Sequence, residues 1–238
     1  MKKSTSLLLI SSLFNLALSS CKLTDSSTTP PSAAFFVVHA SPNAPNVDVI
    51  LNGGVYVQNF AYGSDSGYFL VQPGTYNLKV AAPSGSSVYA IDANTTLEAG
   101  KYYSIFAIDS ASKLKAAIVQ DVLSIPGTDS VRVRFFQFSP DAPYLNAKFK
   151  NTVTTDSLQY SGRSFNDQGN SGTLTDFKTI KAGTYNLDLS TPGSGTPFQS
   201  FTNMVFISGK SYTVYLKGFY GATTGTQTLD KGIVENVQ

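Results

Sequence analysis

The sequence predicts an all-β protein made of two tandem immunoglobulin-like β-sandwich domains. Short runs rich in Val, Ile, Tyr and Phe, such as AFFVVHA, GVYVQNF and YYSIFAI, are separated by clusters of Gly, Pro, Asn or Ser. This is the pattern of strands joined by turns. After the N-terminal segment, no stretch keeps a helical period over about ten residues. About seven or eight such runs in each half of the chain match the size of a sandwich domain.

An internal duplication divides the chain into its two domains. Four blocks of the first half return in the second half in the same order. SPNAP at 41–45 returns as SPDAP at 139–143, GTYNL at 74–78 as GTYNL at 183–187, AGKYYSIFA at 99–107 as SGKSYTVYL at 208–216, and LKAAIVQDV at 114–122 as LDKGIVENV at 229–237. The offset grows along the chain from 98 to 109 and then to 115 residues. The second copy therefore contains insertions, predicted near 162–176 and 218–225.

The repeat blocks fix the expected domain boundaries. Copy 1 is predicted to cover residues 34–123 and copy 2 residues 131–238. The segment between them, SIPGTDS, is short and contains Pro126 and Gly127, which favour a turn. We expect so short a linker to keep the two domains in contact.

The N-terminus is typical of a secreted, lipid-anchored protein. Residues 1–20 combine two lysines with an apolar run that is too short to span a bilayer, which indicates a signal peptide. The run ends in Leu18-Ser19-Ser20-Cys21, which resembles the lipobox of bacterial lipoproteins. That resemblance implies acylation of Cys21 and a membrane anchor. Residues 21–33 are rich in Ser, Thr and Pro and are predicted to form a flexible tether.

Composition excludes several other classes of protein. Cys21 is the only cysteine, so no intramolecular disulfide can form and no other thiol is available. Without Lys2 and Lys3, the chain has fifteen basic and fifteen acidic residues. Nothing in this balance indicates the basic footprint typical of nucleic-acid binding, and no nucleic-acid partner is predicted. No phosphate-binding motif is found, and no cofactor is predicted.

The string VVHASPNAPNVDVILNG resembles the start of a family of bacterial envelope domains of unknown function, the HASPDAP-motif family (family 4397). The resemblance covers copy 1 well and copy 2 more weakly, through SPDAP and GTYNL. It implies a secreted or surface β-sandwich domain, often in tandem, with no established activity. Asn43 stands where the family usually has Asp, and copy 2 lacks the histidine and the second aspartate.

The stretch HASPNAPNVDV contains His39, the only histidine, together with Ser41 and Asp48. A hydrolase or lyase could use Asp48 to orient His39 and His39 to activate Ser41. However, copy 2 has Gln137 and Asn146 at the positions of His39 and Asp48, and it keeps only the serine and the prolines of the bend. Ser-Pro-Asn and Ser-Pro-Asp fit a type I turn. The sequence therefore favours a structural role for His39 and Asp48 and leaves a ligand contact in copy 1 open.

The two insertions are the other candidate sites. In 162–176, oxygens of Asn166, Asp167 and Asp176 could face calcium, but their spacing is not that of an EF-hand, and no metal is predicted. In the second insertion, Phe219 and Tyr220 lie between glycines. Aromatic side chains on loops can stack on sugars or fill a partner's pocket. Tyr160 is a further aromatic candidate.

These observations together predict a non-catalytic protein of the bacterial envelope, anchored through Cys21, with the outer membrane as the expected location. It would serve in binding, adhesion or structure, with a surface glycan or an envelope protein as the partner. One alternative is a glycan-binding component of a polysaccharide-uptake complex. The other is a hydrolase or lyase using His39 and Asp48.

Overall fold

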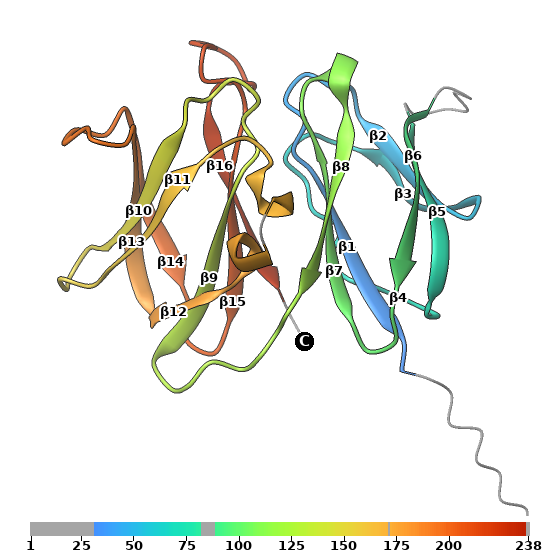
Figure 1. The fold of residues 1–238 in the computed structure, drawn as a ribbon, viewed down its shortest axis with the longest axis horizontal. Coiled ribbons are helices and arrows are strands. Elements are labelled where there is room, and N and C mark those ends of the chain that lie inside the picture. Colours follow the sequence, from blue (N-terminus) through green and yellow to red (C-terminus); the bar gives the residue numbers. More distant parts are fainter. Residues whose placement is uncertain (1–30, 82–88, 171, 237–238) are drawn as a thin grey trace, which may run out of the picture.

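The computed structural model describes residues 31–81, 89–170 and 172–236, and this part of the chain is almost entirely β (Figure 1). It contains β-strands and three short 3₁₀ helices, with no α-helix in the described ranges. The strands form four four-stranded sheets that are grouped into two sandwiches. The all-β class and the two domains predicted from the sequence are confirmed.

In the described ranges, each copy contributes eight strands. The strands of copy 1 are β1 (Ala33–His39), β2 (Val47–Leu51), β3 (Gly54–Phe60), β4 (Phe69–Val71), β5 (Gly74–Ala81), β6 (Tyr89–Leu97), β7 (Tyr102–Ile108) and β8 (Lys115–Asp121). The strands of copy 2 are β9 (Ser130–Gln137), β10 (Leu145–Asn151), β11 (Ser157–Arg163), β12 (Lys178–Lys181), β13 (Gly183–Ser190), β14 (Gln199–Phe206), β15 (Ser211–Lys217) and β16 (Asp230–Asn236). The 3₁₀ helices are η1 (Ala111–Lys113), η2 (Asp167–Gly169) and η3 (Gly172–Thr175).

The two copies have the same strand order. In copy 1 the sheets are β4-β1-β7-β8 and β3-β2-β5-β6, and in copy 2 they are β12-β9-β15-β16 and β11-β10-β13-β14. In each copy the first strand pairs in parallel with the seventh, β1 with β7 and β9 with β15. Both GTYNL blocks begin the fifth strand of their copy. The structure therefore agrees with the duplication that the sequence indicates.

The first insertion is divided between two places. In copy 1, Asn52 and Gly53 alone join β2 to β3, and both have positive φ, +48° and +82°. This is the geometry of a type I′ hairpin. In copy 2, residues 152–156 make the equivalent turn, so part of the extra length lies there. The remainder lies between β11 and β12, where η2 and η3 form. The sequence predicts the whole insertion near 162–176. The repeated blocks at 139–143 and 183–187 show only that extra residues lie somewhere between them, and not at which turn.

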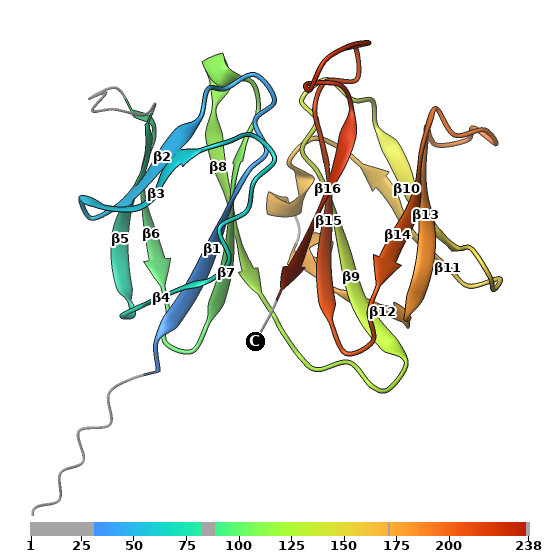
Figure 2. The ribbon, with the colours of Figure 1, turned by 180° about the vertical axis from the view of Figure 1, so that it is seen from behind.

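The inner sheets are buried on both faces, because the two sandwiches pack against each other (Figures 1 and 2). Along β1, Phe35 and Val37 enter the core of copy 1, whereas Phe36 and Val38 enter a third core between the copies. Successive residues of a strand point to opposite faces. An apolar run without alternation, such as AAFFVVH, is therefore what a strand between two cores requires.

The core between the copies is largely aromatic. Phe106 lies at its centre, with ring centroids 5.7 Å from Phe136, 4.9 Å from Phe138 and 5.7 Å from Tyr215. All four residues are fully or almost fully buried, and Phe36 lies 6.1 Å away from Phe106 on the copy 1 side. The two sandwiches therefore form one four-layered body rather than two independent domains on a string.

Candidate functional site

The SPNAP and SPDAP bends connect the first two strands of each copy and also hold the loop after the seventh strand. In copy 1, the Asn43 side-chain oxygen accepts a hydrogen bond from the amide of Ala111 at 2.8 Å. The Ser41 hydroxyl donates to the Asp109 carbonyl at 2.5 Å. The motif therefore acts as a clamp between two loops at one end of the sandwich, in addition to making a turn.

His39 is fully buried beside this bend. Its Nε2 lies 3.0 Å from the Pro45 carbonyl oxygen, and its Nδ1 lies 3.4 Å from the amide nitrogen of Ser41. A neutral imidazole with its proton on Nε2 satisfies both groups. In copy 2, the Gln137 side-chain oxygen accepts the equivalent hydrogen bond from the Ser139 amide at 2.6 Å. Gln137 thus reproduces one of the two contacts that His39 makes.

Asp48 has a different partner from His39. Its carboxylate accepts a hydrogen bond from the amide of Asn59 at 2.7 Å, and Asn59 has a left-handed backbone with φ of +51°. In copy 2, Asn146 accepts from the amide of Gly162, which also has a positive φ of +64°. Both side chains hold an irregular residue of the neighbouring strand. The structure does not bring Asp48 to His39, the contact that the hydrolase alternative requires.

Tyr220 lies on a loop that Asp141 of the SPDAP bend holds in place. The Asp141 carboxylate accepts hydrogen bonds from the amides of Tyr220 and Gly221 at 2.7 and 3.0 Å. Tyr220 is 47% exposed, and its ring forms a T-shaped pair with the ring of Phe198, with 5.2 Å between the ring centroids. The loop begins at Gly218, with φ of +83°, where a Cβ atom would lie 2.1 Å from the Thr228 carbonyl. Tyr220 is therefore fixed by its backbone while its ring faces solvent.

A hollow of about 590 Å³ opens beside Tyr220. Its lining is Phe198, Gln199, Tyr220, Ala222, Thr223, Thr228 and Leu229. Two aromatic rings and several groups that can donate and accept hydrogen bonds thus meet at the end of copy 2. This combination is typical of sites for small polar ligands with an apolar face.

The other predicted aromatic residues are less available. Phe219 is half-buried, and its amide donates to the Gln227 carbonyl at 2.8 Å within the same loop. Tyr160 is buried in the copy 2 core, and its hydroxyl donates to the Val133 carbonyl at 2.5 Å. Burial raises the pKa of Tyr160 well above its usual value. Of the three aromatic candidates, the structure exposes Tyr220.

The insertion between β11 and β12 bridges the two copies. Both carboxylate oxygens of Asp167 accept hydrogen bonds from the Arg163 guanidinium, at 2.8 and 2.6 Å, and both residues are buried. Phe165 packs against the core between the copies, and the Lys115 ammonium of copy 1 lies 4.7 Å from its ring centroid. In the described ranges, no group of three or more His, Cys, Asp or Glu residues could hold a metal ion.

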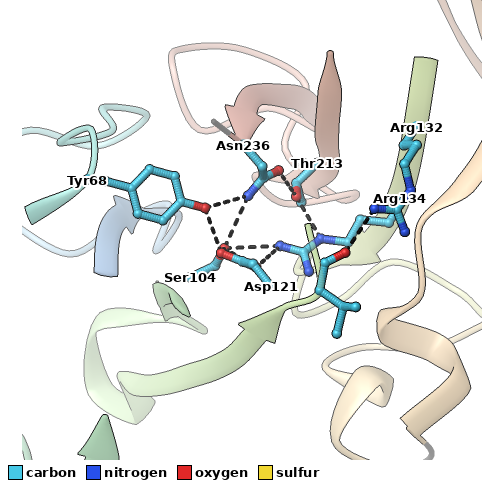
Figure 3. A network of polar contacts seen from close by, with 8 residues as sticks. Tyr68, Ser104, Asp121, Arg132, Arg134, Thr213 and Asn236 are labelled. Atoms are coloured by element: carbon cyan, nitrogen blue, oxygen red, sulfur yellow. Dashed lines mark hydrogen bonds and ion pairs between the residues drawn. The ribbon is translucent and has the colours of Figure 1, made fainter. Parts of the chain in front are cut away.

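A buried polar cluster lies between the copies and was not predicted (Figure 3). The fully buried guanidinium of Arg134 contacts the Asp121 carboxylate at 2.5 Å and the Ser104 and Thr213 hydroxyls at 3.0 and 2.7 Å. Asp121 also accepts hydrogen bonds from the Ser104 and Tyr68 hydroxyls at 2.8 and 2.7 Å. The sequence contains one signal for this cluster, which is the charge of Arg134 within the apolar run VRVRFFQ. A charge that is buried with such a strand needs a buried partner.

Thr213 and Asn236 are further members of the cluster in copy 2. The Thr213 hydroxyl donates to the Asn236 side-chain oxygen at 2.6 Å, and the Asn236 amide group donates to Tyr68 at 3.2 Å. Within each copy, Ser104 and Thr213 occupy the same register position, as do Asp121 and Asn236. The cluster therefore follows the pseudo-symmetry of the duplication.

Two positions of the cluster differ in charge between the copies: Asp121 corresponds to the neutral Asn236, and Arg134 corresponds to Phe36. Arg134 of β9 pairs with Thr213 in the register where Phe36 of β1 pairs with Ser104. Tyr68 packs on Phe36 at 4.9 Å, and at the equivalent place in copy 2 Phe177 lies 4.3 Å from the Arg134 guanidinium. The cluster thus contains one cation, Arg134, and one anion, Asp121, from different copies. It is enclosed by protein on both sides, and we assign it to the assembly of the two copies.

The fold and these contacts define a tandem β-sandwich protein with a candidate binding hollow at the end of copy 2. Residues 33–148 match the model of a family described as a domain of unknown function (DUF4397). The match covers copy 1, β9 and part of β10, and it supports the family predicted from the HASPNAP stretch. No curated protein matches the chain.

Solved structures resemble the chain only remotely. One is a leucine-rich repeat protein from Bacteroides thetaiotaomicron, with 12% identity and a TM-score of 0.20, covering 76% of this chain. The chain spans only 25% of the length of that structure. Another is a streptococcal virulence factor whose structure concerns alpha-glucan binding, with 12% identity and a TM-score of 0.25, covering 77% of this chain and 92% of the other.

We expect protonation of His39 to destabilise the fold. Burial lowers the pKa of His39 from its usual 6.5, and the hydrogen bond to Pro45 offsets part of this change. Well above pH 6.5 the His39 ring is neutral in both the folded and the unfolded state. As the pH falls below 6.5, the unfolded chain binds a proton that the folded chain does not. The free energy of unfolding then decreases, by at most about 1.4 kcal/mol per pH unit, until the lowered pKa is reached.

Urea unfolding of the parent and of His39→Gln between pH 7.5 and 5 measures this effect. Gln137 makes the equivalent contact in copy 2, so the substitution should cost only about 1–2 kcal/mol at neutral pH. The difference in the free energy of unfolding between the parent and His39→Gln should become smaller as the pH falls. Parallel pH profiles would contradict the role that we assign to the neutral imidazole.

The Arg134–Asp121 pair should behave as a coupled unit. Arg134→Phe leaves a buried carboxylate without its cation and should cost about 3–5 kcal/mol. Asp121→Asn leaves the cation unpaired. The double variant gives each position the residue found at the equivalent place in the other copy, Phe36 and Asn236. Its loss of unfolding free energy should be smaller than the sum of the losses in the two single variants, by more than about 1 kcal/mol. Chemical denaturation of the four proteins measures the coupling, and simple additivity would refute it.

Proposed function

We propose that this chain is a non-catalytic binding protein of the bacterial envelope, anchored by lipid at Cys21, and that it binds a glycan through the hollow beside Tyr220. The observation that carries the proposal is the arrangement of Tyr220. Tyr220 is exposed, whereas its backbone is fixed by Asp141 and its ring contacts Phe198 in a T-shaped arrangement. An aromatic face that is held in place before binding loses little conformational entropy when a sugar ring stacks on it.

The polar lining of the hollow supports a carbohydrate as the ligand. Gln199, Thr223 and Thr228 place amide and hydroxyl groups around the two rings. Sugars present an apolar face of C–H groups together with hydroxyls that donate and accept hydrogen bonds. A site with two aromatic rings and several polar groups that carry no net charge fits that chemistry better than it fits a charged ligand.

The direction of the chain supports an anchored protein with an outward-facing site. The described chain starts beside the turn between β6 and β7, where the Gly100 amide donates to the Ser32 carbonyl at 3.1 Å. The loop that carries Tyr220 follows β15 and lies at the opposite end of the strands (Figure 1). A tether from Cys21 therefore reaches one end, and the hollow opens at the other. No helix in the described ranges is long and apolar enough to cross a membrane.

Tyr220→Ala tests the glycan site. Removing the ring should weaken binding at least about tenfold, since exposed aromatic anchors commonly contribute more than about 1.4 kcal/mol. The measurement is binding of the chain from Lys22 onward to an array of soluble polysaccharides, followed by titration with each glycan that binds. Tyr144→Ala is the matched control, because Tyr144 is also exposed but does not line the hollow. A parent protein that binds no glycan, or equal binding by both variants, would overturn this assignment.

Cys21→Ala tests the anchor separately. The change removes the only thiol that can accept the lipid, so the protein should move from the membrane fraction to the soluble fraction. Cell fractionation of the parent and the variant shows the difference, and metabolic labelling with a palmitate analogue should mark the parent alone. If the variant stays with the membranes as the parent does, the anchor is not at Cys21.

A further inference from the structure

We propose that the end of the molecule where β1 starts rests directly on the lipid bilayer, through an apolar patch formed by Val122, Ile125 and Ile207. This proposal rests on the lipid anchor at Cys21 and adds a second membrane contact to it. The folded body would then be held in one orientation, with the Tyr220 hollow facing away from the membrane.

The patch consists of three exposed branched residues from two segments. Val122 and Ile125, in the linker between the copies, are 63% and 83% exposed, and Ile207, in the turn between β14 and β15, is 58% exposed. The two segments lie together, because Ile125, Gly209 and Lys210 line one hollow of about 300 Å³. Hydrogen bonds connect the same region, with the Gly209 amide donating to the Ser130 carbonyl at 2.9 Å. These three side chains belong neither to the core of either copy nor to the core between the copies.

Strand register places the patch at the end where the chain enters the fold. Tyr102 at the start of β7 pairs with Ala34 of β1 on one side and with Asp121 of β8 on the other. The linker begins immediately after Asp121, so Val122 lies at the same level of the sheet as the first residues of β1. Figures 1 and 2 show the linker and the start of β1 at the same end of the molecule.

The length of the tether limits how far this end can lie from the membrane. Ten residue steps separate Cys21 from Pro31, and each spans at most about 3.6 Å, so the reach is about 36 Å or less. A tether this short keeps the patch at a high effective concentration near the lipid. Contacts that would be too weak to recruit a free protein can then hold the body of an anchored one.

The charges at this end favour an apolar contact over an electrostatic one. Exposed Lys101 and Lys210 are balanced by Glu98 and Glu235, and Lys210 forms an ion pair with Glu235 at 2.5 Å. The contact should therefore be equally strong on zwitterionic and anionic bilayers. Branched apolar side chains at the headgroup boundary provide the affinity, as in other interfacial anchors.

The test measures depth in the bilayer at single positions. Acylation occupies Cys21, so one new cysteine at a time, Ile125→Cys, Ile207→Cys or the control Ser112→Cys, can carry a fluorescent label in the anchored protein. Ser112 is exposed and lies in η1, at the opposite end of the strands. In vesicles that contain a lipid-linked quencher, labels at 125 and 207 should be quenched strongly, and the label at 112 should not.

A second variant separates lipid contact from proximity. Ile125→Asp combined with Ile207→Asp should reduce quenching of a label at Val122→Cys several-fold, whereas Val55→Asp, a change at a similarly exposed position on β3, should not. Equal quenching at 112 and 125, or no effect of the double aspartate variant, overturns the proposal. If the lipid anchor itself is absent, the protein will not copurify with vesicles at all, and this outcome is distinct from an anchored protein whose patch stays unquenched.

Discussion

The packing of the two inner sheets against each other is the interaction on which the rest of the structure depends. Sheet β4-β1-β7-β8 and sheet β12-β9-β15-β16 each have a core on both faces. The chain contains one cysteine, so no disulfide can stabilise either sandwich within the molecule. Apolar burial on both faces of the inner strands has to provide that stability. It also fixes the relative orientation of the copies, and thereby places the start of β1 and the Tyr220 loop at opposite ends of the molecule (Figure 1).

Much of this fold could be predicted from the sequence, because its signals are local. Alternating and apolar runs indicate strands, glycine and asparagine indicate turns, and shared blocks reveal the duplication. The sequence signal for β6 is weaker, because YAIDANTTL is rich in polar residues and lies in an outer sheet. The apolar continuity of AAFFVVH indicated strong burial but not the partner on the second face. That partner is a long-range property, and here it is the other copy.

The candidate site could be predicted only in part, for the same reason. The position of Tyr220 on an inserted loop was visible in the sequence, but its support by Asp141 comes from a residue 79 positions away. Tyr160 and Tyr220 looked equivalent as aromatic candidates, yet one lies in a core and the other in solvent. The buried cluster around Arg134 joins residues that are between 13 and 168 positions apart. No local sequence motif predicts such a cluster, because each member belongs to a different strand or loop.

The asymmetry at Arg134 has a consequence for which surfaces can associate. Two copies with the same fold could in principle associate with their own kind, and this would link different molecules into chains or aggregates. A pair of first copies would bury two Asp121 carboxylates with Phe36 in place of the guanidinium. A pair of second copies would bury two Arg134 guanidiniums beside the neutral Asn236. Both arrangements would bury two like charges without a counter-ion. Only the pairing of copy 1 with copy 2 brings Asp121 and Arg134 together and neutralises them. The single ion pair between Arg134 and Asp121 thus disfavours pairing of each copy with its own kind.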